Sequence, residues 1–162
     1  MKSIKLFLAI SVLFLSVTAC MSSTADTATQ APSVSSDTPQ AAVPQASSSG
    51  LITQVVLAKG SDSISAAPVD PSTVFDSKAV IHAVVEISNA PANTKFTAAF
   101  YVVDVGSAAA ANSLITSTDL TSDGTRDLDF TLTPTSSWPS GKYRIDISVN
   151  GQLDQTVPYT VQ

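Results

Sequence analysis

The sequence predicts an all-β fold, a single seven-stranded antiparallel sandwich over residues 51–162. At Leu51 a Ser/Thr/Pro-rich segment gives way to short β-prone runs that are separated by turn residues. Several of these runs alternate apolar and polar residues with a period of two, which is typical of strands with one buried and one solvated face. No part of this region shows strong helical periodicity, so we expect the folded part to be built from strands.

Residues 1–19 have the pattern of a secretory signal peptide. MKSIK carries two lysines, and residues 6–17, LFLAISVLFLSV, are apolar apart from two serines. A basic start, a short apolar run and small residues at its end are the three parts of such a signal. The apolar run is shorter than the roughly 20 residues that a membrane-spanning helix needs.

Cys20 is the sole cysteine of the chain and stands where the apolar run ends. Val17-Thr18-Ala19-Cys20 resembles the bacterial lipobox. The resemblance implies a lipoprotein, in which Cys20 carries a diacylglyceryl thioether, the chain is cleaved before Cys20, and the new amino group is acylated with a fatty acid such as palmitate. Several acyl chains anchor a protein stably, since each buried CH₂ contributes about 0.8 kcal/mol. The alternative is an ordinary signal peptide that is cleaved elsewhere.

The resemblance also suggests a location, the cell envelope. Met21 is not the aspartate associated with retention in an inner membrane, so the outer membrane is favoured if the host has two membranes. Residues 20–50 are expected to be the lipidated cysteine and a disordered linker. Residues 21–50 are dominated by Ser, Thr, Ala, Pro and Gln, with no aromatic, Lys or Arg residue. Such a segment buries too little apolar surface to offset its ordering entropy.

Seven runs are expected as strands: 51–58, 78–87, 95–104, 113–121, 125–133, 142–150 and 152–161. The run 78–87 is almost continuously apolar, which places it in the centre of a sheet. Residues 59–73 and 105–112 are expected as loops, the second with room for a single helical turn.

Alternation assigns faces to two of the runs. In 125–133, Leu128, Phe130 and Leu132 share one face, and Asp127 and Asp129 share the other. A second apolar face is predicted in 142–150, formed by Tyr143, Ile145, Ile147 and Val149.

Asn150-Gly151 predicts a type I′ hairpin between the last two strands, because both central residues of that turn have positive φ. Pro158 lacks a backbone N–H, so the final strand is expected to be an edge at that point.

Residues 138–161, WPSGKYRIDISVNGQLDQTVPYTV, resemble the C-terminal part of bacterial immunoglobulin-like modules. The resemblance rests on the Trp138-Pro139 pair, the Gly141-x-Tyr143 strand entry and the Asn-Gly hairpin, and residues 72–104 fit the central strands. It covers roughly residues 51–162 and implies an immunoglobulin-like sandwich. We expect Trp138 and Pro139 to cover one end of it and Tyr143 to hydrogen-bond to nearby backbone. The cysteine pair of antibody domains is absent.

Composition and motifs argue against several functions. A net charge of −5, a pI near 4.4 and only 8 Lys and Arg residues argue against a nucleic-acid partner. A lone strand histidine, His82, is more often a packing or surface residue than a catalytic base. No phosphate loop, HExxH or GxSxG is present, so we expect neither an enzyme nor a cofactor.

Asp119, Asp123, Asp127 and Asp129 surround Gly124 and offer oxygen ligands of the kind that calcium takes. Their spacing does not match an EF-hand loop, and turn chemistry and a solvated strand face explain them more simply. No metal site is therefore predicted, although calcium stays open at this point.

The expected function is that of a membrane-anchored lipoprotein that displays a non-enzymatic binding, adhesion or envelope-assembly module, with an envelope protein or glycan as candidate partner. One alternative is a carbohydrate-binding module, which would need Trp138 exposed on a flat face with other aromatic residues. The other is an enzyme, which would need a cleft that joins His82 to carboxylates.

Overall fold

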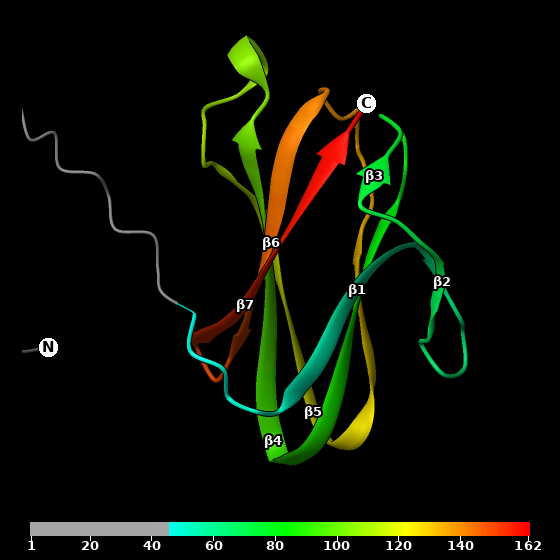
Figure 1. Ribbon diagram of the computed structural model, residues 1–162, viewed down its shortest axis with the longest axis vertical. Coiled ribbons are helices and arrows are strands. Elements are labelled where there is room, and N and C mark those ends of the chain that lie inside the picture. Colours follow the sequence, from blue (N-terminus) through cyan, green and yellow to red (C-terminus); the bar gives the residue numbers. More distant parts are fainter. Residues whose placement is uncertain (1–45) are drawn as a thin grey trace, which may run out of the picture. The chain divides into compact units, whose positions relative to one another are not determined.

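The computed structural model describes residues 46–162, which form a single sheet of seven strands (Figure 1). The predicted signal peptide (1–19), Cys20 and linker residues 21–45 lie outside the described residues.

The strands are β1 (Ile52–Ser61), β2 (Pro68–Pro71), β3 (Val74–Phe75), β4 (Ile81–Asp104), β5 (Leu114–Leu132), β6 (Gly141–Val149) and β7 (Gln152–Val161). A short 3₁₀ helix, η1 (Gly106–Ala108), is the only helix among residues 46–162. The all-β prediction is therefore confirmed. The strand order is β2-β1-β4-β6-β7-β3, with β5 also paired to β4, and the sheet curls into a half-barrel.

The predicted sandwich of separate antiparallel strands is corrected in two respects. The runs 78–87 and 95–104 belong to one strand, β4, and the runs 113–121 and 125–133 belong to one strand, β5. The short strands β2 and β3 restore the number to seven. Because β3 runs parallel to β7, the sheet is mixed and not purely antiparallel.

The merging of the runs has a local cause. The segments that were expected as turns, around Asn89–Asn93 and Gly124, lie opposite each other and remain paired, with Ala90 facing Gly124. Positive φ angles at Asn89 (53°), Asn93 (64°) and Gly124 (70°) produce bulges and a bend within one long hairpin. Turn-forming residues therefore bend β4 and β5 without interrupting them.

β4 is the centre of the sheet, as its apolar first half predicts. Residues 81–87 pair with β1 on one side and with the end of β5 on the other. Residues 96–104 pair with β6, and 94–101 with the beginning of β5. Each half of β4 thus has two neighbours, and the bend lets both halves face one core.

The core has the composition that the alternation predicts. Leu128, Phe130 and Leu132 of β5 are buried. So are all four apolar residues of β6, Tyr143, Ile145, Ile147 and Val149. Other large and fully buried side chains are Phe75, Phe96, Phe100, Ile81 and Ile87. Burying a side chain of this size stabilises the fold by about 1.5–3 kcal/mol.

Of the two segments expected as loops, only 105–112 is a loop in the structure. Most of 59–73 is not a loop but the β1–β2 hairpin, whose turn is closed by Asp62: its Oδ1 accepts the N–H groups of Ile64 at 3.0 Å and Ser65 at 2.8 Å. The segment 105–112 connects β4 to β5 and contains η1.

The β6–β7 hairpin turns at Asn150 and Gly151, with φ angles of 50° and 83°. Asn150 also joins the hairpin to β4, because its N–H donates to the Lys95 carbonyl at 2.8 Å and its Oδ1 accepts the Lys95 N–H at 3.0 Å.

Gly141 starts β6 at φ +152° and lies against the end of β4. A Cβ atom at this position would collide with the Asp104 carbonyl oxygen and lie 2.9 Å from Val105 Cγ1. Gly141→Ala should therefore lower the free energy of unfolding by about 2 kcal/mol in urea denaturation. Gly60→Ala is the matched control, since its Cβ would lie at an ordinary 3.7 Å from Val69 Cβ. Equal stability of the two variants would contradict the predicted clash.

Two buried tyrosines predict a loss of stability at alkaline pH. The Tyr143 and Tyr159 rings stack with centroids 5.3 Å apart, and burial raises the pKa of both phenols above the usual value of 10.0. A raised folded-state pKa favours the neutral form, so this stability is present below about pH 10 and is lost as pH rises further. Tyr159→Phe should make the decline in unfolding free energy above about pH 10 shallower. An unchanged decline in the Tyr143→Phe, Tyr159→Phe double variant would refute this assignment.

Candidate functional site

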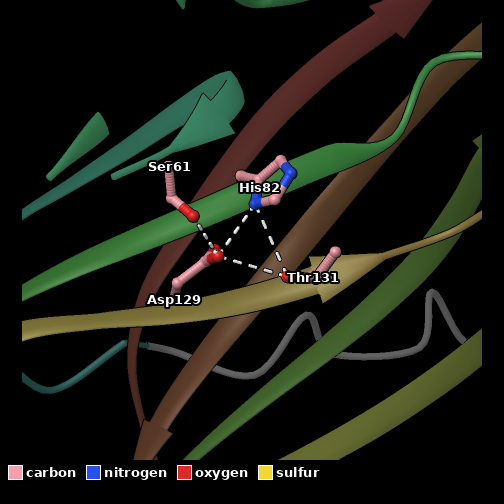
Figure 2. A network of polar contacts seen from close by, with 4 residues as sticks. All are labelled: Ser61, His82, Asp129 and Thr131. Atoms are coloured by element: carbon pink, nitrogen blue, oxygen red, sulfur yellow. Dashed lines mark hydrogen bonds and ion pairs between the residues drawn. The ribbon is translucent and has the colours of Figure 1, made fainter. Parts of the chain in front are cut away.

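Four polar side chains meet where β1, β4 and β5 lie side by side (Figure 2). Oδ2 of Asp129 is their common acceptor. It lies 2.6 Å from Ser61 Oγ, 2.8 Å from His82 Nδ1 and 3.2 Å from Thr131 Oγ1. We refer to Ser61, His82, Asp129 and Thr131 as the Asp129 cluster.

The register of the sheet assembles this cluster. His82 of β4 faces Thr131 of β5, and Asp129 lies one alternation earlier on the same face. The side chains of His82 and Asp129 are 16% and 17% exposed. Oδ1 of Asp129 is buried with no hydrogen-bond partner among residues 46–162. Asp129 therefore lies on the face opposite Leu128 and Phe130, as the alternation predicts, but His82 and Ser61 shield most of its side chain from solvent.

The order of the contacts does not suit nucleophilic catalysis. In a Ser-His-Asp triad the imidazole lies between the acid and the hydroxyl, so that it can take the hydroxyl proton. Here Ser61 and His82 both bind the same carboxylate oxygen, and Thr131 Oγ1 lies 3.5 Å from the imidazole nitrogen that already faces Asp129. The cluster is therefore arranged to tie three strands together.

The other acidic residues around Gly124 are dispersed. Asp119 pairs with Lys95 at 2.8 Å, and Asp123 pairs with Arg126 at 3.2 Å. The hydrogen bond from Lys95 lowers the pKa of Asp119. Within the described part of the chain, no group of three or more His, Cys, Asp or Glu side chains is placed to hold a metal ion.

Trp138 and its neighbours lie between β5 and β6. Trp138 is half-buried against the core, and its Nε1 donates to the Ala79 carbonyl at 3.0 Å. The Tyr143 hydroxyl donates to the Pro139 carbonyl at 2.6 Å. Trp138 thus does not stand exposed on a flat face, which is what the carbohydrate-binding alternative required of it.

A different polar arrangement covers the outward face of β4, β6 and β7. The Arg144 guanidinium lies 4.4 Å from the centroid of the Tyr101 ring. Its Nε donates to Asp146 at 3.2 Å, and Asp146 Oδ1 also accepts the Thr156 hydroxyl at 2.8 Å. The alternation in 142–150 predicts which of its residues face the core, but it does not reveal this arrangement on the opposite face.

Two hollows flank β7. The outer hollow lies on the outward face and has a mainly apolar lining, formed by Thr73, Val103, Lys142, Tyr143, Arg144, Thr156, Pro158, Tyr159 and Thr160. The inner hollow lies between β1 and β7 and is lined by Gln54, Val55, Val56, Leu57, Pro71, Ser72, Thr73 and Val157. Neither hollow includes a member of the Asp129 cluster.

Comparison with known proteins finds no matching family model and no matching curated protein. Among solved structures, one match is the alkylpurine DNA glycosylase AlkC of Pseudomonas fluorescens bound to DNA containing an abasic site analog. The identity is 14% and the TM-score 0.38, over 56% of this chain and 28% of the glycosylase chain.

This match corrects one expectation. Because the matched protein is bound to DNA, it contradicts the exclusion of nucleic acid as a partner, and the exclusion is withdrawn. A TM-score of 0.38 in turn carries no argument that this chain binds DNA or acts on it.

In residues 46–162, no helix has the length and apolar character that a membrane span requires.

The Asp129 cluster yields a stability prediction. Asp129→Ala would leave Ser61 and His82 without their shared acceptor, so we expect a loss of about 1.5–3 kcal/mol in unfolding free energy, measured by urea denaturation. Asp123→Ala is the control, because its pair with Arg126 is more than half exposed and contributes about 0–0.5 kcal/mol. Similar losses in both variants would show that the cluster adds no special stability.

Proposed function

We propose that this chain is a bacterial lipoprotein, anchored to a membrane through Cys20, that displays an immunoglobulin-like domain as a non-enzymatic binding module of the cell envelope. The observation that carries the proposal is the position of Cys20 after Val17-Thr18-Ala19, where the apolar run ends. A thiol is needed there because the lipid is attached as a thioether.

The strand pairing supports the immunoglobulin-like part of the proposal. The first half of β4 pairs with β1 and the end of β5, and the second half pairs with β6 and the beginning of β5. The bend thus gives the curled sheet two halves over one core, which supports a sandwich-like arrangement whose strands pass from one half to the other. The bond from Tyr143 to Pro139 has the form of a tyrosine corner, in which the hydroxyl bonds to backbone a few residues upstream.

The chemistry of the domain supports binding over catalysis. The Asp129 cluster lacks the order of a proton relay, and Arg144 and Asp146 satisfy each other. The described chain is also attached firmly where the linker ends, because the Ser47 N–H donates to the Leu153 carbonyl at 2.9 Å and the Ser49 N–H donates to Asp154 Oδ2. Residues 47 and 49, at the end of the expected linker, are therefore bound to the start of β7, which supports a domain displayed on a tether.

Metabolic labelling tests the anchor. The wild-type chain should incorporate labelled palmitate and sediment with membranes, and Cys20→Ala should lose both properties because the thioether cannot form. Ser22→Ala is the control and should behave as wild type. A Cys20→Ala chain that still takes up palmitate and stays with membranes would overturn the proposal.

A further inference from the structure

We propose that β7 carries a β-strand-addition site, in which its free edge at Thr156–Pro158 binds an extended peptide of a partner protein. The peptide has an apolar side chain on each face and a carboxylate-bearing residue near Lys142. The inference deepens the binding role proposed above by naming the class of partner, and it is tested independently of the lipid anchor.

The edge of β7 is occupied at both ends and free between them. β6 covers one side of the strand. On the other side, Ser47 bonds to Leu153, and the Thr160 N–H donates to the Thr73 carbonyl at 2.9 Å next to β3. No described strand pairs with the intervening residues on that side.

Alternation identifies the unpaired backbone groups. Residues of one parity direct both N–H and C=O toward the same neighbour. Because Thr160 faces β3, Thr156 and Pro158 face the same side, where Thr156 offers an N–H and a C=O and Pro158 offers only a C=O. These groups could bond to an added strand in line with β3.

The edge formed by β5 is guarded against such pairing. β5 has only β4 as a neighbour, and charged residues recur along it, which oppose the approach of another strand. These are Asp119, Asp123, Arg126 and Asp127. By contrast, residues 155–161 of β7 carry no charge.

The two hollows lie where the side chains of an added strand would point. Successive residues of a strand project to opposite faces, and strand-addition sites use pockets for alternate side chains to gain specificity. The outer hollow lies on one face of β7 and includes Thr156 and Pro158, and the inner hollow includes Val157 on the other. Thr73 lines both hollows, which places them on either side of one edge.

Charge selects the kind of peptide. Lys142 lines the outer hollow and is exposed, with no ion-pair partner among residues 46–162. Arg144 lines the same hollow but is bound to Asp146. The remaining lining is uncharged and largely apolar. The site therefore suits a neutral, β-prone peptide with a carboxylate that reaches Lys142.

The test uses a short amidated peptide of alternating valine and threonine with one glutamate at its end, titrated into the purified full-length chain. Binding is followed by calorimetry and by slowed hydrogen exchange of the Thr156 N–H. A version with N-methylated backbone, which cannot form strand hydrogen bonds, should not bind. A version that ends in lysine should bind more weakly than the glutamate peptide.

Two variants of the chain form a matched pair. Thr156→Pro removes the outward donor and should weaken binding about fivefold, the typical effect of one hydrogen bond. Pro158→Thr adds a donor two residues along the same edge and should strengthen binding by about the same factor. If Thr156→Pro fails to fold, Pro158→Thr and the N-methylated peptide still decide the matter.

Three results would overturn the proposal: equal binding of the N-methylated peptide, no exchange protection at Thr156, or no change in affinity for Pro158→Thr. Self-association of Pro158→Thr without peptide binding would identify a second copy as the occupant and would also reject it. None of these results bears on palmitate labelling of Cys20, so failure of the site and failure of the anchor are distinguishable.

Discussion

The fold depends on one strand that serves both halves of the curled sheet while keeping the same face toward the core. In the first half of β4 the odd-numbered residues Ile81 to Ile87 are buried, whereas in the second half the even-numbered residues Phe96 to Val102 are buried. A regular strand cannot change parity, since a slip of one residue turns every side chain over. The bulged bend between Asn89 and Asn93 makes the change, and β5 bends with it.

The bend also determines where the sheet stays open. β5 pairs with both halves of β4 and so lies on the same side of each half. On the opposite side, β1 and β2 border one half and β7 the other, and the short segment 72–75 connects them through Leu57 and β3. The uncharged edge of β7 is therefore a product of the topology, and its two hollows are the spaces that segment 72–75 does not fill.

Local patterns in the sequence predict the all-β class of the fold, the buried faces of β5 and β6, and the β6–β7 hairpin. They do not predict features that depend on pairing between residues far apart in the sequence. Ser-Asn-Ala-Pro-Ala-Asn (88–93) has the composition of a loop. Its register with Gly124 and the hydrogen bonds of Ser88 to Leu51 and Asn89 to Thr125 keep it within β4. The Asp129 cluster escaped detection for the same reason, because His82 and Asp129 are 47 residues apart and meet only when β4 and β5 pair.

Trp138 gives the molecule a built-in optical reporter. It is the one tryptophan of the sequence, it packs against the core, and its indole N–H is bound to the Ala79 carbonyl. Its emission wavelength and quenching by iodide would follow detachment of the β5–β6 connection from the segment before β4, free of background from any second indole. Fluorescence could thus separate local fraying at this end from global melting, without labels.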